Sequence, residues 1–340
     1  MGKFGLVICK FGYNIDTIKK ILVVRFSSLG DILLTTPVIG ELRKKYPNAE
    51  INFVIKKQFS DVYLYNTNIN KKFIFRKEIA DSLNKELTAE NYDLVIDLQN
   101  NWRSRSLTKG ISKNITRFKK PTFKKLLLVW FKINLLKENK SIVKRYAEAA
   151  GITLEGKVLE LFLPKDSKSR LDSNGNYIGL CPGAKHFTKR WPPEYFIELG
   201  NELTKLGYRI VLFGGTSEKD LCNDISGKIE GAVNLQGDDN LIQVAVDMQK
   251  CKLVVTNDSG LMHVASAVGA PVTAIFGSSV KEFGFAPYGV KNLILENNFL
   301  SCRPCSHIGR SNCPKKHFKC MKEVTPQGVL QSIQKFRQEL

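Results

Sequence analysis

The stretch at 253–277 constrains the fold more than any other part of this 340-residue chain. Its sequence, LVVTNDSGLMHVASAVGAPVTAIFG, predicts a buried strand, a polar turn, a helix and a second buried strand. Asp258 or Ser259 is suited to cap the helix, and Gly260 permits close approach of the backbone to a ligand. At the carboxyl edge of a parallel sheet, such a helix start predicts an anion site, usually for a diphosphate. An ordinary strand-to-helix turn is the alternative.

A second turn of this design follows the first strand. Residues 21–26, ILVVRF, form an apolar run that is typical of a strand buried on both faces. Ser28, Gly30 and Asp31 come next, and the pattern predicts a helix at 32–46. A carboxylate at the carboxyl end of a strand can accept a proton from a hydroxyl nucleophile, so Asp31 is a candidate base. A simple helix cap is the alternative role for this residue.

Two further turns follow strands in the second half of the chain. After the strand predicted at 177–181, Gly183 and Ala184 form a tight turn and Lys189 follows. A lysine beside exposed N–H groups can neutralise a phosphate, a role that we favour over that of an ordinary surface lysine. Glu218 follows a glycine-rich turn after the next strand. It is suited either to bind a ribose hydroxyl pair or to close a capping box, and the sequence leaves both open.

Strand and helix patterns alternate in two successive series. They predict an α/β protein with two doubly wound, Rossmann-like domains that face each other across a cleft. We place the N-terminal domain at 18–165, the C-terminal domain at 166–325 and a C-terminal helix at 326–340. The predicted strands are 21–26, 50–55, 72–75 and 93–97 in the first series, and 177–181, 209–213, 252–256 and 271–276 in the second.

The formal net charge of +20 is concentrated in one segment. Residues 103–145 hold fourteen lysines and arginines and a single acid, Glu138. So lopsided a segment predicts a polyanionic partner: nucleic acid, an anionic membrane surface or a phosphorylated substrate. Within it, FKKLLLVWFKINLLK at 123–137 is too short to span a bilayer. This stretch either lies in a membrane interface, with Trp130 and Phe131 at headgroup level, or packs on its own domain.

The eight cysteines divide into a cluster and a scattered group. Cys302, Cys305, Cys313 and Cys320 form the cluster, with His307 and His317 nearby in the sequence. In a cytoplasmic protein such a cluster more often binds Zn(II) than forms disulfides, although its second half is spaced more loosely than in a zinc ribbon. A structural zinc, free thiols and disulfides all stay open. The scattered cysteines, which we interpret as small apolar residues, are Cys9, Cys181, Cys222 and Cys251.

Four motifs together resemble a known family. They are FSSLGDILLTTPVIGELRKKYPNAEI, PGAKHFTKRWPPEYF, FGGTSEKD and NDSGLMHVASAVGAPVTAIFG. Their order and spacing are similar to those of the glycosyltransferase family 9 heptosyltransferases, from about Ile21 to the C-terminus. The first and last motifs are quite specific as a pair. The resemblance implies a GT-B fold and inverting transfer of a heptose from an ADP-sugar to the inner core of lipopolysaccharide, with no cofactor required for the chemistry.

The resemblance also implies roles for single residues. Asp31 matches the family's proposed base, with Ser28 and Gly30 shaping its loop, and Lys189 matches the lysine near the donor diphosphate. Glu218 is a looser match to a nucleoside-binding acid. The other matches are the phosphate-loop backbone and the donor-binding turn (Gly183, Ala184, Asp258, Ser259, Gly260, His263) and an acceptor-facing pair (Asn101, Arg103).

The implied partners are an ADP-sugar donor, a phosphorylated glycolipid acceptor (the lipid A–Kdo core) and an anionic membrane surface, with no nucleic acid. The apolar run at 6–9 is too short for a signal peptide, so we expect a cytoplasmic enzyme on the inner face of the inner membrane. A transferase of the same fold that uses another nucleotide sugar in surface polysaccharide synthesis is the alternative.

Two other classes of protein fit the sequence less well. The basic segment lacks the interleaved aromatic residues and the standard modules of nucleic-acid-binding proteins. A Rossmann-type oxidoreductase would carry G-x-G-x-x-G after its first strand, where this chain has SSLGD.

Overall fold

The computed structural model describes residues 18–136, 140–237 and 240–338. The N-terminal extension with Cys9, and Lys137 and Glu138 of the basic segment, lie outside the described residues. The chain forms two compact units. Unit 1 comprises Met1–Lys120 and Ile142–Lys157, and unit 2 comprises Pro121–Ser141 and Val158–Leu340. These bounds differ from the predicted domains because the described residues of 121–136 and 140–141 belong to the second unit, and the first unit ends at residue 157.

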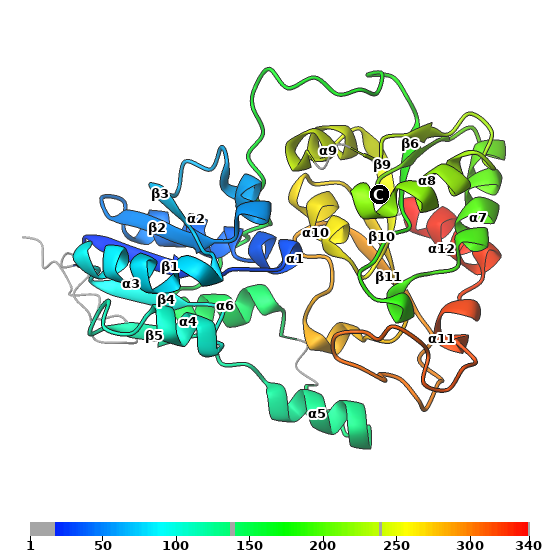
Figure 1. The fold of residues 1–340 in the computed structure, drawn as a ribbon. Helices are drawn as coiled ribbons and strands as arrows, with labels where there is room; N and C mark the ends of the chain where they lie inside the picture. The colour runs from blue at the N-terminus through cyan, green and yellow to red at the C-terminus, as the bar shows by residue number, and fades with distance from the viewer. Residues whose placement is uncertain (1–17, 137–139, 238–239, 339–340) are drawn as a thin grey trace, which may run out of the picture. The chain divides into compact units, whose positions relative to one another are not determined.

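Unit 1 is built on a parallel five-stranded sheet. Its elements are β1 (Lys20–Val24), α1 (Leu29–Leu33), α2 (Thr36–Lys45), β2 (Glu50–Ile55), β3 (Lys71–Ile74), α3 (Ala80–Ala89), β4 (Leu94–Asp97), α4 (Trp102–Leu107), β5 (Ile115–Arg117) and α6 (Ile142–Ala150). The strand order is β3-β2-β1-β4-β5, and every pair is parallel. Helices α2 and α6 lie on one face of the sheet, and α3 and α4 lie on the other (Figure 1).

The helix predicted at 32–46 is two helices in the structure, α1 and α2. Pro37 lies in the first turn of α2, where it supplies no backbone N–H and disfavours helical geometry in the residue before it. At the break, Thr36 Oγ1 donates to Leu33 O at 2.8 Å, and this is the carbonyl that an N–H at position 37 would bond in an unbroken helix. The break leaves α1 as a short helix directly after the first strand, and Asp31 lies in its first turn.

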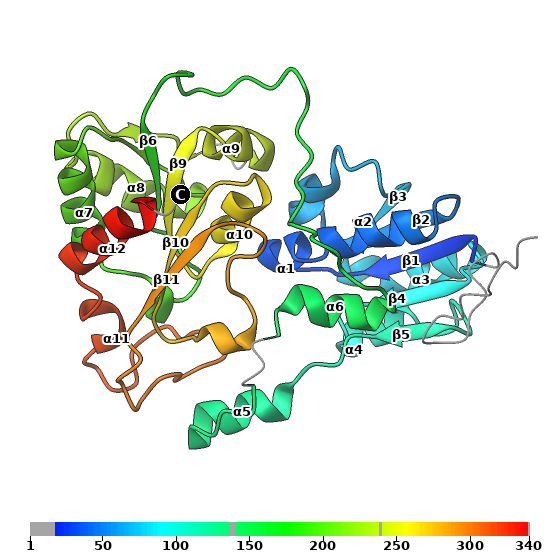
Figure 2. The same cartoon turned by 180° about the vertical axis from the view of Figure 1, so that it is seen from behind.

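Unit 2 contains a second, larger parallel sheet. Its elements are α5 (Thr122–Phe131), β6 (Tyr177–Cys181), α7 (Pro193–Lys205), β7 (Arg209–Leu212), α8 (Lys219–Ser226), β8 (Val233–Asn234), α9 (Leu241–Met248), β9 (Cys251–Asn257), α10 (Gly260–Ala267), β10 (Val272–Phe276), β11 (Asn292–Glu296), α11 (Lys319–Lys322) and α12 (Pro326–Gln338). The strand order is β11-β10-β9-β6-β7-β8. Helices α7, α8 and α12 cover one face, and α9 and α10 cover the other (Figure 2).

The two alternating series predicted from the sequence are confirmed, and the eight predicted strands are all present. Three further strands, β5, β8 and β11, are not among those predicted. Each of these lies at the edge of its sheet, and their side chains are mostly half-buried. A short edge strand lacks the continuous apolar run that marks a central parallel strand, so its pattern is weak.

Both sheets reverse their strand order beside the first strand of the unit. β1 lies between β2 and β4, and β6 lies between β7 and β9. In open α/β sheets, ligands bind outside the carboxyl ends of the strands at such a switch point. The loops after β1 and β4 in unit 1, and after β6 and β9 in unit 2, carry most of the predicted site residues.

Candidate active site

In unit 1, hydrogen bonds join the loops after β1 and β4. Gln99 Oε1 accepts from Phe26 N at 3.0 Å, and Arg25 Nη1 donates to Leu98 O at 2.8 Å. Arg25 Nε also donates to Ser27 O at 2.9 Å, and the side chain of Arg25 is only 8% exposed. These bonds fix the guanidinium in one place, so Arg25 is a rigid cation at the switch point.

Asp31 lies against this fixed cation. Its Oδ1 is 2.6 Å from Arg25 Nη2 and accepts a longer hydrogen bond, at 3.3 Å, from the hydroxyl of Tyr146. Its Oδ2 accepts from Ser28 Oγ at 2.7 Å and from Ser28 N at 3.2 Å. The bond from Ser28 N belongs to a capping box at the start of α1, so the capping role predicted as the alternative is present.

The pKa of Asp31 follows from these contacts. Burial by itself raises the pKa, but the charge of Arg25 and the hydrogen bonds from Ser28 outweigh burial and leave the pKa below its usual value. Asp31 is therefore ionised at neutral pH and able to accept a proton.

Asn101 and Arg103 follow β4, at the same sheet edge as Asp31. The side-chain oxygen of Asn101 accepts from Ser104 N at 3.0 Å and caps α4. Arg103 is exposed, and its guanidinium lies 5.3 Å from the ring centroid of Trp102. The structure thus gives Asn101 a capping contact, and the roles of both residues toward an acceptor stay predictions.

In unit 2, a buried asparagine joins the loops after β6 and β9. Asn257 Oδ1 accepts from Trp191 N at 3.0 Å, and Asn257 Nδ2 donates to Pro182 O at 2.7 Å. Arg190 Nε donates to Ala184 O at 2.7 Å. These bonds hold the tight turn after β6 against the end of β9.

Lys189 and Asp258 form an ion pair at this switch point. Lys189 Nζ is 2.6 Å from Asp258 Oδ2, and the two side chains are 15% and 10% exposed. Ser279 Oγ donates to the same carboxylate at 2.5 Å. Burial by itself raises the pKa of Asp258, but Lys189 and Ser279 outweigh it and leave the pKa lowered. The structure therefore brings together the predicted phosphate-binding lysine and the predicted donor turn.

Gly183 and Glu218 also meet in unit 2. A Cβ atom at Gly183 would lie 2.6 Å from Glu218 Cγ, so a glycine is what allows the turn after β6 to approach this side chain. Glu218 Oε2 accepts from Gly215 N at 2.9 Å and caps the 3₁₀ turn Thr216–Glu218 before α8. The capping role is thus present, and nucleoside binding by Glu218 stays a prediction.

The start of α10 carries the remaining predicted donor-site residues. Ser259 is the N-cap residue and makes no side-chain capping bond, and its Oγ lies 3.5 Å from Thr256 Oγ1. Gly260 is the first residue of the helix. His263 is buried one turn later, close enough for its charge to contribute to the lowered pKa of Asp258. The first N–H groups of a helix have no intrahelical partner, so they are suited to an anion.

Residues outside the predicted set also contribute to these contacts, among them Arg25, Tyr146, Ser279 and Arg303. Arg303 Nη2 donates to Ser279 O at 2.8 Å and to Glu296 Oε2 at 2.8 Å, and so fixes the loop that holds Asp258. Arg25 had a local signal, because an arginine inside a strand buried on both faces requires a partner. The other three come from distant parts of the chain, and no local pattern marks them.

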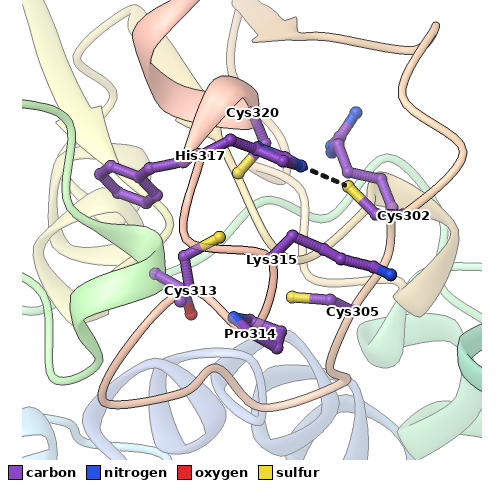
Figure 3. Close-up of a pocket in the computed structure, with 10 residues that line it drawn as sticks. Cys302, Cys305, Cys313, Pro314, Lys315, His317 and Cys320 are labelled. Carbon is purple, nitrogen blue, oxygen red and sulfur yellow. Dashed lines mark hydrogen bonds between the residues drawn. The ribbon is translucent and has the colours of Figure 1, made fainter.

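The four clustered cysteines line one pocket of unit 2 together with His317 (Figure 3). Figure 3 shows their thiols pointing into this pocket, and Cys302 Sγ lies 3.8 Å from His317 Nε2. Burial and the neighbouring thiols raise the pKa of Cys320 to about 12. All seven cysteines of the described residues are free. Within the same residues, no group of three Cys, His, Asp or Glu side chains is arranged to hold a metal ion.

The chain is similar in sequence to a known family. Residues 80–316 match the model of Glycosyltransferase family 9 (heptosyltransferase). Lipooligosaccharide heptosyltransferase 2 of Campylobacter jejuni is 28% identical over 323 residues, which cover 90% of this chain and 96% of that protein.

Two solved structures share the fold over nearly the whole chain. The E. coli ADP-heptose lps heptosyltransferase II matches with a TM-score of 0.75 and 25% identity, over 94% of this chain and 100% of its own. E. coli heptosyltransferase WaaC with ADP-2-deoxy-2-fluoro heptose matches with a TM-score of 0.68 and 21% identity, over 93% of this chain and 99% of its own. These matches confirm the predicted GT-B fold class, which combines two Rossmann-like α/β units.

Proposed function

This chain belongs to glycosyltransferase family 9, the heptosyltransferase family, and we propose that it moves a heptose from ADP-heptose onto the inner core of lipopolysaccharide, with inversion. Two findings support the substrates: the relative from Campylobacter jejuni is a lipooligosaccharide heptosyltransferase, and a structural neighbour holds an ADP-heptose analogue. The transfer that we propose uses no cofactor for its chemistry.

The Lys189–Asp258 pair beside the start of α10 is the observation that carries this proposal. As the bond between the sugar and the diphosphate breaks, negative charge grows on the leaving ADP. The ammonium group of Lys189 and the first N–H groups of α10 offer donors for that charge. The ammonium group of a lysine has three N–H donors, so Lys189 can bond Asp258 and a phosphate oxygen at the same time.

The acceptor half of the reaction falls to Asp31. The acceptor hydroxyl oxygen forms the new bond to the anomeric carbon, ADP leaves with the electrons of the old bond, and the hydroxyl proton passes to the carboxylate. The charge of Arg25 lowers the pKa of Asp31, so this carboxylate is a weak base. We therefore expect proton transfer to accompany formation of the new bond, when the hydroxyl has become acidic.

Release of ADP tests the proposal. The purified enzyme is mixed with ADP-heptose, ADP-glucose or UDP-glucose, with or without a core glycolipid that lacks the heptose to be added. We expect rapid ADP release only with ADP-heptose and the glycolipid together, and a mass increase of one heptose on the acceptor. Turnover of another nucleotide sugar, with none from ADP-heptose, would instead support a surface polysaccharide transferase of the same fold.

We also place the enzyme in the cytoplasm, peripheral on the inner face of the inner membrane. A lipid-anchored, phosphorylated acceptor and the basic segment at 103–145 support this location. Cell fractionation should find the full-length chain with the inner membrane at low salt. If the chain were recovered wholly in the soluble fraction, the proposed location would be contradicted, but the proposed reaction would not be.

The cysteine pocket is our proposed site for one structural Zn(II). Four thiols and an imidazole are a donor set that zinc prefers, but the described side chains would have to move to surround an ion. Metal analysis of the purified chain should find about one zinc per molecule. Cys305→Ser should lose the zinc, and the buried Cys222→Ala should keep it. A metal-free chain whose thermal stability is unchanged by added zinc would contradict this site.

A further inference from the structure

Helix α5 packs on unit 2 through one side only. Leu128 is buried and clusters with Leu136 and Phe283. Lys125 Nζ lies 5.5 Å from the ring centroid of Phe283 and 5.1 Å from that of Phe285. The partly buried Val129 packs against the same cluster, so the inward side of the helix consists of one leucine, one valine and the stem of a lysine.

The opposite side of α5 is the more apolar one, and it is exposed. Phe123, Leu126 and Trp130 follow each other at intervals of three and four residues and so form one stripe, which Phe131 widens. Their exposed fractions are 71%, 39%, 70% and 70%, in chain order. A contiguous group of large exposed apolar side chains on a soluble protein usually marks an interaction surface.

The end of α5 is bonded to the body of unit 2. Lys132 Nζ donates to Pro304 O at 2.8 Å and to Cys302 O at 3.3 Å, and burial lowers the pKa of Lys132. The chain continues through Ile133 and Leu135, each 50% exposed, which extend the apolar surface beyond the helix. The exposed face is therefore held in place by specific contacts.

Charge selects the class of partner for this surface. Between residues 119 and 136 the chain has five lysines and neither aspartate nor glutamate. Lys124 is exposed on the helix itself, beside the apolar stripe. Two copies of the surface would bring like charges together, whereas anionic lipid headgroups would meet lysines of opposite charge. Exposed aromatic and leucine side chains flanked by lysines are typical of a helix that lies in a membrane interface.

We infer that the outer face of α5, with Ile133 and Leu135, docks this enzyme on an anionic lipid bilayer. Trp130 and Phe131 enter the boundary between headgroups and acyl chains, and Lys124 contacts lipid phosphates. None of the helices in the described part of the chain is long and apolar enough to cross a membrane. With 10 residues, α5 is about half the length that a bilayer-spanning helix needs, and its apolar stripe covers one side, so we expect it to lie along the surface. This inference refines the peripheral location proposed above and is tested without the transfer reaction.

The test is flotation of the full-length chain with vesicles of phosphatidylcholine alone or with one third phosphatidylglycerol. We expect binding to the anionic vesicles and little to the neutral ones. The double variant Trp130→Ser/Phe131→Ser should lose at least about tenfold in partition, and Lys124→Glu should lose less. Phe299→Ser is the matched control, because Phe299 is 99% exposed elsewhere in unit 2, and this variant should bind like the wild type.

Trp130→Phe serves as a further control for the fold, because it keeps an aromatic side chain. It should still bind, with less quenching of tryptophan fluorescence by brominated lipids than the wild type shows. Equal partition of the double variant and the wild type would overturn the inference. So would a stable dimer that the double variant alone converts to a monomer. Transfer to a soluble, deacylated acceptor should survive in the double variant, so failure of docking and failure of the proposed reaction are distinguishable.

Discussion

Each unit places a carboxylate beside a cation at the switch point of its sheet, but the two pairs are built differently. In unit 1, Arg25 donates to two backbone carbonyls as well as to Asp31, so the cation is fixed. Both carboxylates accept further hydrogen bonds, Asp31 from Ser28 and Asp258 from Ser279, so the difference lies in the cations. Lys189 is a point charge at the end of a flexible stem.

The difference indicates which member of each pair acts on a substrate. The guanidinium of Arg25 is held by its neighbours and cannot turn toward a ligand. It therefore lowers the pKa of Asp31, and Asp31 is the member of the pair that contacts the acceptor hydroxyl. An ammonium group can turn from Asp258 toward a phosphate. Proton transfer therefore belongs to unit 1, and charge stabilisation belongs to unit 2. The following variants test this division, from the largest expected effect to the smallest.

Asp31→Ala should have the largest effect on turnover. Removal of a general base costs roughly 10²- to 10⁴-fold, and we expect kcat to fall within that range. The KM for the donor should change little. Steady-state kinetics with a core glycolipid measure both constants. Asp81→Ala, which removes an exposed aspartate from unit 1, is the control and should behave like the wild type.

Lys189→Ala should affect both binding and rate. The ammonium group contacts the diphosphate before and during bond breakage, so we expect kcat/KM to fall by about 10²-fold, shared between the two constants. Lys250→Ala removes an exposed lysine of unit 2 and should leave both unchanged. A loss confined to kcat would show that Lys189 does not hold the donor in the ground state.

Asp258 should make stability depend on acid pH. Its pKa is lowered in the folded state, so its contribution is fully present above the unfolded value, about 4, and is lost as pH falls through the lower folded value. The melting temperature of Asp258→Asn should be lower than that of the wild type at pH 7. Between pH 5 and pH 3, the melting temperature of Asp258→Asn should fall less than that of the wild type. Parallel curves would contradict the pairing with Lys189.

Tyr146→Phe should have the smallest effect. It removes one long hydrogen bond to Asp31, worth about 0.5–1.5 kcal/mol, so kcat should fall by no more than about tenfold. Loss of a donor to the ionised carboxylate should also raise the pKa of Asp31. The acid limb of the pH–rate profile should therefore move to higher pH. An unchanged limb together with a lower melting temperature would assign the tyrosine a structural role only.

The sequence predicted the turns of this site better than the contacts within them. Lys189 and Asp258 lie in separate turns, each marked by a buried strand, small residues and a helix start, so both could be found locally. Their pairing depends on β6 and β9 being neighbours in the sheet, which no local pattern specifies. Arg25 lies in the apolar run that predicts the first strand, which marks it as a buried cation but does not identify Asp31 as its partner.

The exposed side of α5 shows the same limit of local information. The apolar run at 126–131 fits a packed helix or an interfacial one equally well. Its sequence does not say which side meets the protein, and that side is decided by Phe283, more than 150 residues away.

Titration calorimetry with ADP tests the division between the units most directly. ADP is titrated into the wild type, Asp31→Ala and Lys189→Ala under one buffer condition. We predict that Asp31→Ala binds ADP within a few-fold of the wild type and that Lys189→Ala binds it at least about tenfold more weakly. Equal losses of affinity in the two variants would contradict the account.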